Sequence, residues 1–465
     1  MTIRYLVFFA QVHPEFRLPE LQSIAELYGF QVIKPASLPG VSENEIWNPS
    51  RPFWVIDLED EAHAIALAER CILIKSIYEL YGHGNTYEDV HSQTLACAHL
   101  WQRFKEDTSF RFIVTAYSDR IPMSRQKEIV DSFAFMDMRG KIDLKNPDET
   151  FTCYEEYPDA RYKTKEDDGK NTLLHIFFGR LVTVGKARAL VQKFDVKKRS
   201  YYGNTSMEAE ISLLMANQTL ASPGKFIYDP FMGTGSMAYT AAQFGAFVFG
   251  SDIDGRQMRG KGDSPGIMIA ATQYGVAPRI IDLCTFDVTR NPLRCGDLFD
   301  AIVTDPPYGV RAGAKRLGRK ESDRDRRVQK RLANPERELL QTTAQEDYVP
   351  PTKPYELSDL VRDLVRLARY LLRPNGRLVF FLPTVTDEYE AVDVETALCS
   401  GMEVVANSVQ DFGNWGRRLI TIKKTTNESF GSPFEDGEET DDDSKNHVPA
   451  HKDFREKYFK RFQKN

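Results

Sequence analysis

The sequence predicts an α/β protein whose larger part is an open sheet of parallel strands with helices between them. Short apolar runs are typical of buried strands, and a turn and a helical run follow them, as in Phe226-Ile227-Tyr228 and the stretch from Met237 to Phe244. Acidic residues follow such runs at positions 229, 252, 287 and 305. Because ligands of open α/β sheets bind at the carboxyl ends of the strands, we expect the four acids to converge on one crevice.

Length and pattern indicate more than one domain. The chain has 465 residues, enough for two or three domains, and 42% of them are apolar, which is enough for real cores. In the N-terminal part we expect strands at 4–10, 53–58 and 110–117, and helices at 18–28, 61–71 and 124–133. In the C-terminal part we expect a helix at 357–372 and strands at 377–382, 403–405 and 419–422.

Composition excludes several classes of protein. The formal charge of -6, from 61 Lys+Arg against 67 Asp+Glu, is not that of a nucleic-acid binder, so any RNA contact must come from local basic surface. The six cysteines are scattered and the histidines do not cluster beside them, so neither a disulfide framework nor a metal site in this chain is expected. The sequence contains no apolar stretch long enough for a membrane span and no signal peptide. We therefore expect a cytoplasmic or nuclear protein, with the cytoplasm preferred.

A glycine-rich loop follows the strand at 226–228. In Asp229-Pro230-Phe231-Met232-Gly233-Thr234-Gly235-Ser236, two glycines let the backbone approach a ligand closely. Gly233 and Gly235 would also fit a dinucleotide fingerprint, and Asp252 would suit a ribose in either case. Asp229 favours the other possibility, because a carboxylate repels a pyrophosphate and tolerates a sulfonium or ammonium cation. Asp287 follows the apolar run at 280–281 and could accept a hydrogen bond from an adenine amino group.

The stretch Asp305-Pro306-Pro307-Tyr308 ends the strand expected at 299–304 and carries the most specific chemistry. The prolines make the turn stiff. The Asp305 carboxylate and backbone carbonyls can accept hydrogen bonds from an NH2 group, while Tyr308 offers a flat face for a planar base. An amine held by two acceptors turns its nitrogen toward an electrophile. Together the four strand-end acids predict a Rossmann-like methyltransferase that uses S-adenosylmethionine.

Two basic segments are candidates for contact with RNA. Lys197, Lys198 and Arg199 precede an aromatic pair, a combination that suits phosphates and unstacked bases, although a solvated linker would look similar. From Arg311 to Arg337 eleven Lys/Arg stand against four Asp/Glu, a charge of 11 − 4 = +7. Because this segment leaves the end of the catalytic strand, the insertion at 311–352 is expected to act as a lid or substrate clamp.

Residues 140–151 resemble the signature turn of the THUMP domain, an RNA-binding module of tRNA-modifying enzymes. We expect two short strands there, joined by an Asn-Pro-Asp turn, and a closing strand at 173–184. A structural hairpin without an RNA role is the alternative. With the segments at 197–207, 229–235, 251–254 and 305–309, the chain resembles the catalytic subunit of the eukaryotic tRNA (guanine(10)-N(2))-methyltransferase family.

The resemblance implies a fold, a substrate and a partner. It implies a Rossmann-like class I methyltransferase domain at 186–427, preceded by an α+β domain at 1–60 and a THUMP-like domain at 61–185; we expect a disordered charged tail at 428–465. It also implies that Asn204, Thr205, Ser206 and Met207 line the methionine end of the cofactor. The further residues expected to bind the cofactor are Asp229, Phe231, Gly233, Gly235, Asp252 and Asp287. The implied partners are tRNA and a small zinc-binding activator protein.

Two other functions remain open from the residues alone. One is methylation of a different amine, such as adenine N6 or a protein glutamine, since those enzymes also place an acidic or amide residue before Pro-Pro and an aromatic. The other is a non-catalytic RNA-binding scaffold with a vestigial methyltransferase fold. The THUMP-like turn favours tRNA over the first, and Asp229, Gly233, Asp305 and Tyr308 argue against the second. The tRNA species and the number of methyl groups transferred cannot be read from the sequence.

Overall fold

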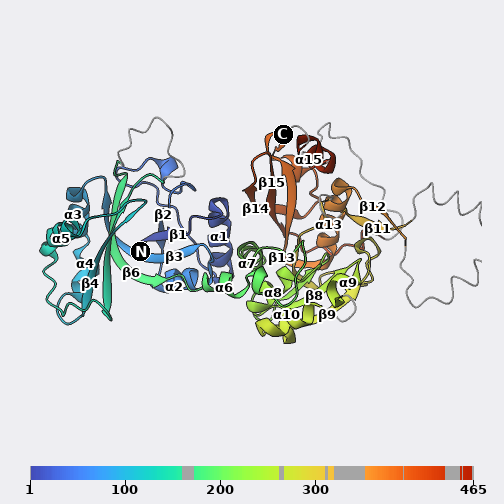
Figure 1. Ribbon diagram of the computed structural model, residues 1–465, viewed down its shortest axis with the longest axis horizontal. Coiled ribbons are helices and arrows are strands. Elements are labelled where there is room, and N and C mark those ends of the chain that lie inside the picture. Colours follow the sequence, from blue (N-terminus) through green and yellow to red (C-terminus); the bar gives the residue numbers. More distant parts are fainter. Residues whose placement is uncertain are drawn as a thin grey trace, which may run out of the picture. The chain divides into compact units, whose positions relative to one another are not determined.

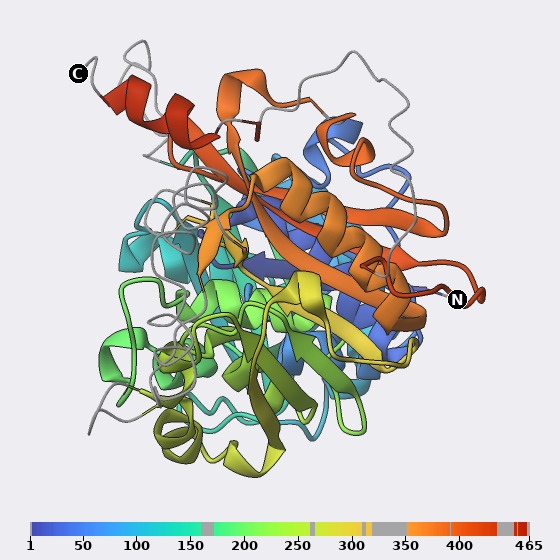
Figure 2. The same ribbon diagram turned by 90° about the vertical axis from the view of Figure 1, so that its right-hand side faces the viewer.

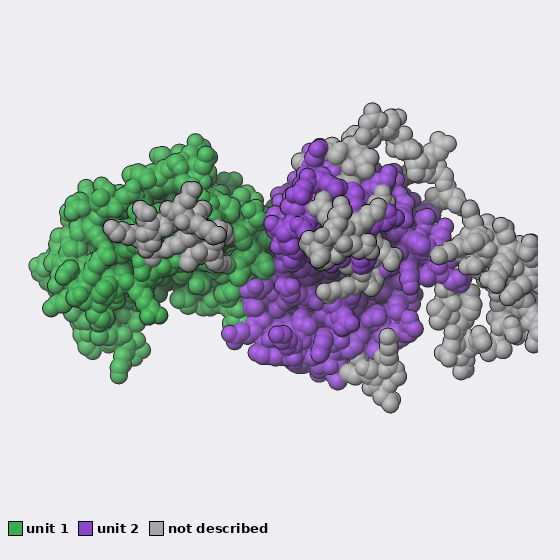
Figure 3. Space-filling model, turned by 45° about the horizontal axis from the view of Figure 1, so that its top comes forward, with its two compact units in different colours: residues 1–190 green, residues 191–465 purple. Residues whose placement is uncertain are grey.

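The computed structural model describes residues 2–159, 172–260, 266–308, 313–318, 351–390, 392–434, 451–452 and 454–462. The chain divides into two compact units, Met1–Leu190 and Val191–Asn465 (Figure 3). Each unit is built around its own large sheet (Figure 1). The finer division predicted at residues 60, 185 and 427 stays a prediction, although the sheet of the first unit runs through both 1–60 and 61–185.

The first unit contains one six-stranded mixed sheet in the order β2-β1-β3-β6-β5-β4. Neighbouring strands are antiparallel except β4 and β5, which are parallel. The strands are β1 Ile3–Phe9, β2 Phe53–Leu58, β3 Ile74–Gly84, β4 Phe110–Tyr117, β5 Glu149–Glu156 and β6 His175–Val184. The helices are α1 Arg17–Tyr28, α2 Glu61–Arg70, α3 Tyr87–Ala96, α4 Ala98–Trp101 and α5 Met123–Ser132.

The helices and strands predicted at 4–133 are confirmed within a few residues, whereas β3, α3 and α4 were not predicted. β3 is buried almost throughout, so its sequence lacks the alternation of a half-exposed strand. A charged residue within β3 makes the strand harder still to recognise from its sequence. Glu79 is buried there, and its carboxylate accepts a hydrogen bond from Arg180 Nε of β6 at 2.9 Å.

The THUMP-like turn differs from the expected pair of strands. Only the second strand, β5, forms, while Ile142 makes an isolated bridge to Phe110. The preceding residues form a turn in which the Asp143 carboxylate accepts hydrogen bonds from the backbone N–H groups of Lys145 and Asn146, both at 3.0 Å. This side chain satisfies the backbone locally, and a strand is therefore not needed there.

The second unit contains a seven-stranded sheet in the order β14-β15-β13-β10-β7-β8-β9. β13, β10, β7, β8 and β9 are parallel to one another, and β15 is antiparallel to both of its neighbours. The strands are β7 Phe226–Asp229, β8 Phe247–Asp252, β9 Ile280–Thr285, β10 Phe299–Thr304, β13 Leu372–Val385, β14 Met402–Asp411 and β15 Trp415–Lys424. The helices are α6 Ala189–Lys193, α7 Ala209–Gln218, α8 Ser236–Gln243, α9 Gly255–Arg259, α10 Ile267–Tyr274, α13 Leu357–Leu371, α14 Val392–Glu395 and α15 Phe454–Phe462.

The parallel strands are held by a core between the sheet and α13, which lies across one face of the sheet (Figure 2). Leucines, valines and an alanine of α13 at helical spacing are buried against β10 and β13. The rings of Tyr228 on β7 and Phe299 on β10 stack at 5.0 Å in the same core. This packing fixes the positions of the strand ends, where the candidate site lies.

Two short strands lie near the two ends of the predicted lid segment at 311–352. β11 (Lys315–Leu317) pairs with β12 (Thr352–Pro354) in an antiparallel two-stranded sheet. Residues 309–312 and 319–350 lie outside the described residues, so the lid prediction is untested.

Part of the tail predicted to be disordered is ordered. α15 packs its aromatic side chains on the start of β15: the rings of Phe454 and Tyr458 lie 5.9 and 5.6 Å from Trp415. Lys457 Nζ lies 2.7 Å from a Glu388 carboxylate oxygen. Phe454 and Tyr458 are spaced one helical turn apart, which is a sequence signal for a helix. The acidic run that precedes them made the whole tail look disordered.

Candidate active site

Four acidic side chains lie at the carboxyl ends of neighbouring parallel strands. Asp229 and Asp252 end β7 and β8, Asp305 directly follows β10, and Asp287 lies two residues beyond β9. The order β10-β7-β8-β9 therefore places Asp229 between Asp305 and Asp252. The predicted convergence of these acids at one edge of the sheet is present in the structure.

Asp229 is fully buried and only half satisfied. Its Oδ1 accepts hydrogen bonds from Thr304 Oγ1 at 2.8 Å and from the backbone N–H of Phe231 at 3.1 Å. Its Oδ2 is buried and has no hydrogen-bond partner among the described residues. The pKa of Asp229 is raised to about 8: burial is the main cause, the two hydrogen bonds oppose it, and the nearby carboxylates of Asp252 and Asp305 add to it. A cation beside Oδ2 would stabilise the ionised form, which fits a sulfonium or an ammonium group.

The glycine loop between β7 and α8 is shaped by Asp252. The backbone N–H of Gly233 donates to Asp252 Oδ2 at 2.9 Å, and Asp252 Oδ1 accepts from the backbone of Asp254 at 2.8 Å. Gly233 and Gly235 have φ of +51° and +82°, which other residues rarely adopt. At Gly235 a Cβ would also lie only 3.0 Å from the Tyr239 ring. The backbone of the loop is therefore accessible to a ligand bound at the strand ends.

Asp287 has less free capacity than the other acids. Its Oδ1 accepts from the backbone N–H and the hydroxyl of Thr289, at 2.8 and 2.9 Å. Its Oδ2 accepts from the backbone N–H of Leu317 at the start of the lid segment. A contact with an adenine amino group stays a prediction, and it would use the lone pairs that these bonds leave over.

The segment 204–207 lies against the glycine loop. Ser206 Oγ is 2.8 Å from Thr234 Oγ1, and the backbone N–H of Met207 donates to Ser236 Oγ at 3.1 Å. Asn204 and Thr205 are exposed beside them. Phe231 packs partly into the core of the sheet, and its ring is half-buried. The predicted cofactor residues on this segment and on the loop are therefore neighbours in space.

The turn after β10 is closed by its own aromatic residue. The Tyr308 hydroxyl donates a hydrogen bond to Asp305 Oδ1. Both side chains are half-buried, Pro306 is buried, and Pro307 is partly exposed. Burial raises the pKa of Asp305, whereas Arg417 and the Tyr308 hydroxyl lower it. The predicted acceptor and the predicted stacking ring are therefore in direct contact.

Arg417 is a site residue that the sequence did not reveal. It lies near the start of β15, opposite Pro383 of β13, and interacts electrostatically with Asp305 and Tyr308. A lone arginine in an alternating strand has no distinguishing signal. The pairing of β15 with β13 brings it to the site, and pairing is not visible in one sequence.

The basic segment before the catalytic unit is divided between surface and core. Lys197 and Lys198 are exposed, as an RNA contact requires. Arg199 is instead buried at 3% exposure, and its Nη1 donates to Ser236 Oγ at 2.8 Å while its Nε donates to the Tyr274 hydroxyl at 3.2 Å. Its position differs from the predicted RNA contact, because the guanidinium holds the start of α8.

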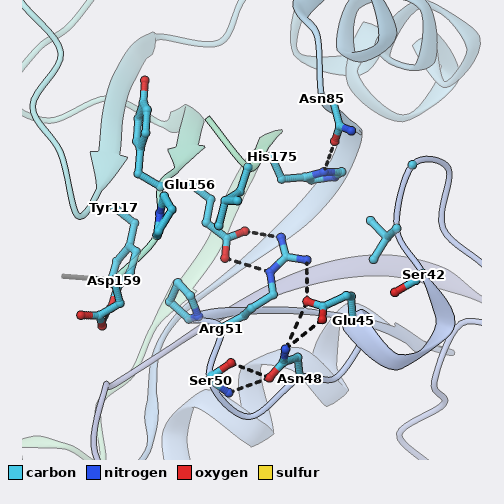
Figure 4. Close-up of a pocket in the computed structure, with 16 residues that line it drawn as sticks. Ser42, Glu45, Asn48, Ser50, Arg51, Asn85, Tyr117, Glu156, Asp159 and His175 are labelled. Carbon is cyan, nitrogen blue, oxygen red and sulfur yellow. Dashed lines mark hydrogen bonds and ion pairs between the residues drawn. The ribbon is translucent and has the colours of Figure 1, made fainter. Parts of the chain in front are cut away.

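A cavity of about 530 Å³ lies elsewhere, within the first unit (Figure 4). At its wall the Arg51 guanidinium pairs with both oxygens of Glu156 and approaches Glu45 at 3.7 Å. His175 Nδ1 lies 2.9 Å from Asn85 Oδ1. None of the predicted catalytic or cofactor residues lines this cavity, whose charged lining residues are Arg51 and the three acids Glu45, Glu156 and Asp159.

Within the described ranges there is no group of three or more His, Cys, Asp or Glu side chains arranged to hold a metal. Within the same residues, no helix is both long and apolar enough to cross a membrane.

Two family models match the chain. Residues 3–187 match a model described as the Tmrp11 THUMP N-terminal domain, and residues 197–321 match one described as the RMKL-like methyltransferase domain. Among solved structures, TrmN from Thermus thermophilus aligns with 90% of this chain and 99% of its own, with a TM-score of 0.39 and 17% identity. The two matched models and the arrangement of the sheets define a class I methyltransferase with an N-terminal THUMP domain.

Relatives with known names cover almost the whole chain. The tRNA (guanine(10)-N(2))-methyltransferase of Saccharomyces cerevisiae is 36% identical over 467 residues, which are 99% of each chain. The enzyme of the same name from Schizosaccharomyces pombe is 33% identical over 98% of this chain and 96% of its own. Human tRNA (guanine(10)-N(2))-methyltransferase TRMT11 is 32% identical over 98% and 95%. The chain belongs to the tRNA (guanine(10)-N(2))-methyltransferase family.

Proposed function

We propose that this protein transfers a methyl group from S-adenosylmethionine to the exocyclic N2 of a guanosine in tRNA, at position 10, as the catalytic subunit of a two-protein complex. The observation that carries the proposal is the membership of the whole chain in this family, combined with Asp229 and Asp305 on adjacent strands. The names of the relatives supply the nucleoside and its position.

The proposed cofactor site fits the chemistry of the residues present. The buried Asp229 carboxylate, with one oxygen unpartnered, suits the positive charge of the methionine part. Asn204, Thr205, Ser206 and Met207 would line the same end, because this segment contacts the glycine loop. Asp252 would hold the ribose hydroxyls and Asp287 the adenine. When bound, the cofactor supplies a methyl group on a sulfonium, which is already an electrophile.

On the substrate side the chain's own residues position the amine. Asp305 and the Pro306 carbonyl accept hydrogen bonds from the guanine NH2, and Tyr308 stacks on the base. The amine nitrogen is then directed at the methyl carbon. As this nitrogen takes the methyl carbon of a bound cofactor with cleavage of the C–S bond, the Asp305 carboxylate, the acceptor of the amine hydrogen bond, would receive the proton that the nitrogen releases. Most of the acceleration comes from orientation in a site without bulk water, and the base must leave its stack to reach it.

The proposed RNA-selecting part is the first unit, with Lys197 and Lys198 beside the catalytic unit. Its match to a THUMP model supports this role. The proposed cytoplasmic location is supported by the six cysteines, which are all free thiols.

The proposed partner, a small zinc-binding activator protein, would cover β9. This strand is an edge of the sheet with β8 as its neighbour there, and its Ile281 side chain is 56% exposed. An unprotected apolar edge strand favours pairing with another chain. Co-expression with candidate partners tests this. Ile281→Lys should weaken the complex, whereas Val405→Lys on β14, the opposite edge, should not. A soluble, active single chain would contradict the proposal.

The experiment that tests the proposed reaction is mass spectrometry of tRNA nucleosides from cells that lack the protein. Loss of N2-methylguanosine at position 10, restored by the wild-type gene and not by Asp305→Ala, is the expected result. Loss of a methylated adenosine from the tRNA instead, or loss of methylglutamine from the proteins of the same cells, would identify a different amine. Absence of S-adenosylmethionine binding by the purified protein would indicate a scaffold.

A further inference from the structure

Arg417 reaches the candidate site because β15 runs against the parallel strands. The start of an antiparallel strand lies at the same edge of the sheet as the ends of its parallel neighbours. Arg417 is the third residue of β15 and is paired with Pro383 near the end of β13 and with Gln410 near the end of β14. β13 in turn is the neighbour of β10, whose end carries Asp305.

The guanidinium of Arg417 is held in place by three neighbours. Its Nε donates to Gln410 Oε1 at 2.7 Å. Its central carbon lies 4.5 Å from the ring centroid of Phe381 and 5.8 Å from that of Phe412. The hydrogen bond from Nε and the stacking on the two rings fix the plane of the guanidinium. The two terminal nitrogens are then left to interact with the candidate site.

The Tyr308 hydroxyl is the group that links Arg417 to Asp305. A phenol has one proton to donate and an oxygen that accepts. The proton goes to Asp305 Oδ1, and Arg417, which only donates, acts on the oxygen. Tyr308 is thus hydrogen-bonded to Asp305, and both groups lie within the electrostatic influence of Arg417.

We propose that Arg417 is a positioning residue for the amine site. It holds the Tyr308 ring while Asp305 exchanges the Tyr308 hydroxyl for the NH2 of the incoming base, and its positive charge keeps Asp305 ionised. The inference rests on the proposed function, because it assumes that Asp305 receives the substrate amine. Without Arg417, Tyr308 would lose its anchor when it leaves Asp305, and the base would lose an oriented stacking surface.

The charged and titratable groups around Asp305 fix the direction of a pH effect. Tyr308 of the same turn, Asp229 of β7 and Arg417 of β15 interact with it. Burial raises the pKa of Asp305, and Arg417 lowers it. Removal of Arg417 therefore raises that pKa. Since the ionised carboxylate is the better acceptor, the acidic limb of the rate profile should move to higher pH.

Arg418 provides a matched control on the same strand. Successive residues of a strand point to opposite faces. The Arg418 guanidinium lies 3.4 Å from the ring centroid of Tyr389, and its Nη1 donates to Asn407 Oδ1 at 3.2 Å. It is thus an equally half-buried, stacked arginine, with described contacts to Tyr389 and Asn407 in place of Asp305 and Tyr308.

The test compares Arg417→Gln, Arg417→Lys and Arg418→Gln in the full-length protein, purified with its partner if it needs one. We expect Arg417→Gln to lower kcat about tenfold or more, the effect of one charged hydrogen-bonding group, with unchanged S-adenosylmethionine affinity and the acidic limb at higher pH. Arg417→Lys keeps the positive charge, so the acidic limb of its pH profile should lie where it does in wild type. Its kcat should be only partly restored, since lysine does not stack or bind Gln410 in the same way. Arg418→Gln should match wild type in pH profile.

Two results would overturn the inference. One is a wild-type kcat for Arg417→Gln. The other is that Arg417→Gln loses activity without a shift of its pH profile and Arg418→Gln loses activity in the same way. That outcome would indicate a structural role only. A wild-type protein that does not methylate guanosine would instead refute the proposed function, and is therefore distinguishable from both.

Discussion

The carboxylates of Asp229 and Asp305, which end adjacent strands, are satisfied in opposite ways. Asp229 is fully buried, bonds to the chain through one oxygen only, and has no cation bonded to it among the described residues. Asp305 is half-buried, accepts from Tyr308 and lies near Arg417. The proposed cofactor side thus has an unmet need for a positive charge, whereas the proposed substrate side has partners of its own that a substrate must replace. The same residue type therefore has different proposed roles on the two sides: Asp229 attracts a cation, and Asp305 accepts a hydrogen bond from the amine.

Replacing the substrate-side acid should have the largest effect. We expect Asp305→Ala to lower turnover about 100-fold or more, the scale of one preorganised polar contact at a reacting centre, while the cofactor affinity and the melting temperature stay near wild type. Asp305→Asn should be milder, because an amide oxygen still accepts one hydrogen bond. Methylation assays with Asp359→Ala, an exposed acid of α13, serve as the control. A wild-type rate for Asp305→Ala would falsify the assignment.

Replacing the cofactor-side acid should act on binding. Asp229→Ala should weaken S-adenosylmethionine affinity about tenfold or more, because it removes a charged contact from a buried site. Affinity for tRNA should persist. Calorimetry with the cofactor and filter binding with tRNA separate the two effects. Equal losses of both affinities would mean that the variant is misfolded or that the two sides are not distinct.

The buried acid should also make the cofactor-free protein sensitive to pH. Burial raises the pKa of Asp229 from 3.8 to about 8, so the folded protein binds a proton that the unfolded chain releases. Stability must therefore fall as pH rises between those two values. Thermal unfolding of wild type should lose a few degrees more than Asp229→Asn over pH 5 to 8, a change of about 2–4 °C for each kcal/mol. Parallel curves for the two proteins would contradict the buried, unpartnered carboxylate.

The smallest effects should come from the basic segment. Replacing Lys197 and Lys198 together by Ala should weaken tRNA binding a few-fold and reduce its salt dependence, with no change in melting temperature. Arg199→Ala should lower the melting temperature, because it removes the buried bonds to Ser236 and Tyr274. If Arg199→Ala changed only tRNA affinity, the buried position of this side chain would be wrong.

The sequence was most informative where local chemistry determines local structure. The strand ends, the glycine loop and the turn at Asp305 each carry their own signal, so the parallel half of the sheet and its acids were predictable. β3 was missed because it is buried almost throughout and contains a paired charge, so no alternation appears. Arg417 and the burial of Arg199 depend on contacts between residues far apart in the chain, and a single sequence does not contain that information.

The hairpin that carries Arg417 has a consequence for which changes the protein can tolerate. β14 and β15 are joined by a tight connection in which Asp411 pairs with Gly416 and Gly413 has a φ of +88°. Side chains alternate between faces along a strand, so a shift of one residue in the pairing would turn Arg417 to the other side of the sheet and bring a neighbour into its place. Surface loops usually tolerate insertions and deletions. In this connection we expect relatives to vary in residue type but not in length, because its length sets which side chain the active site receives.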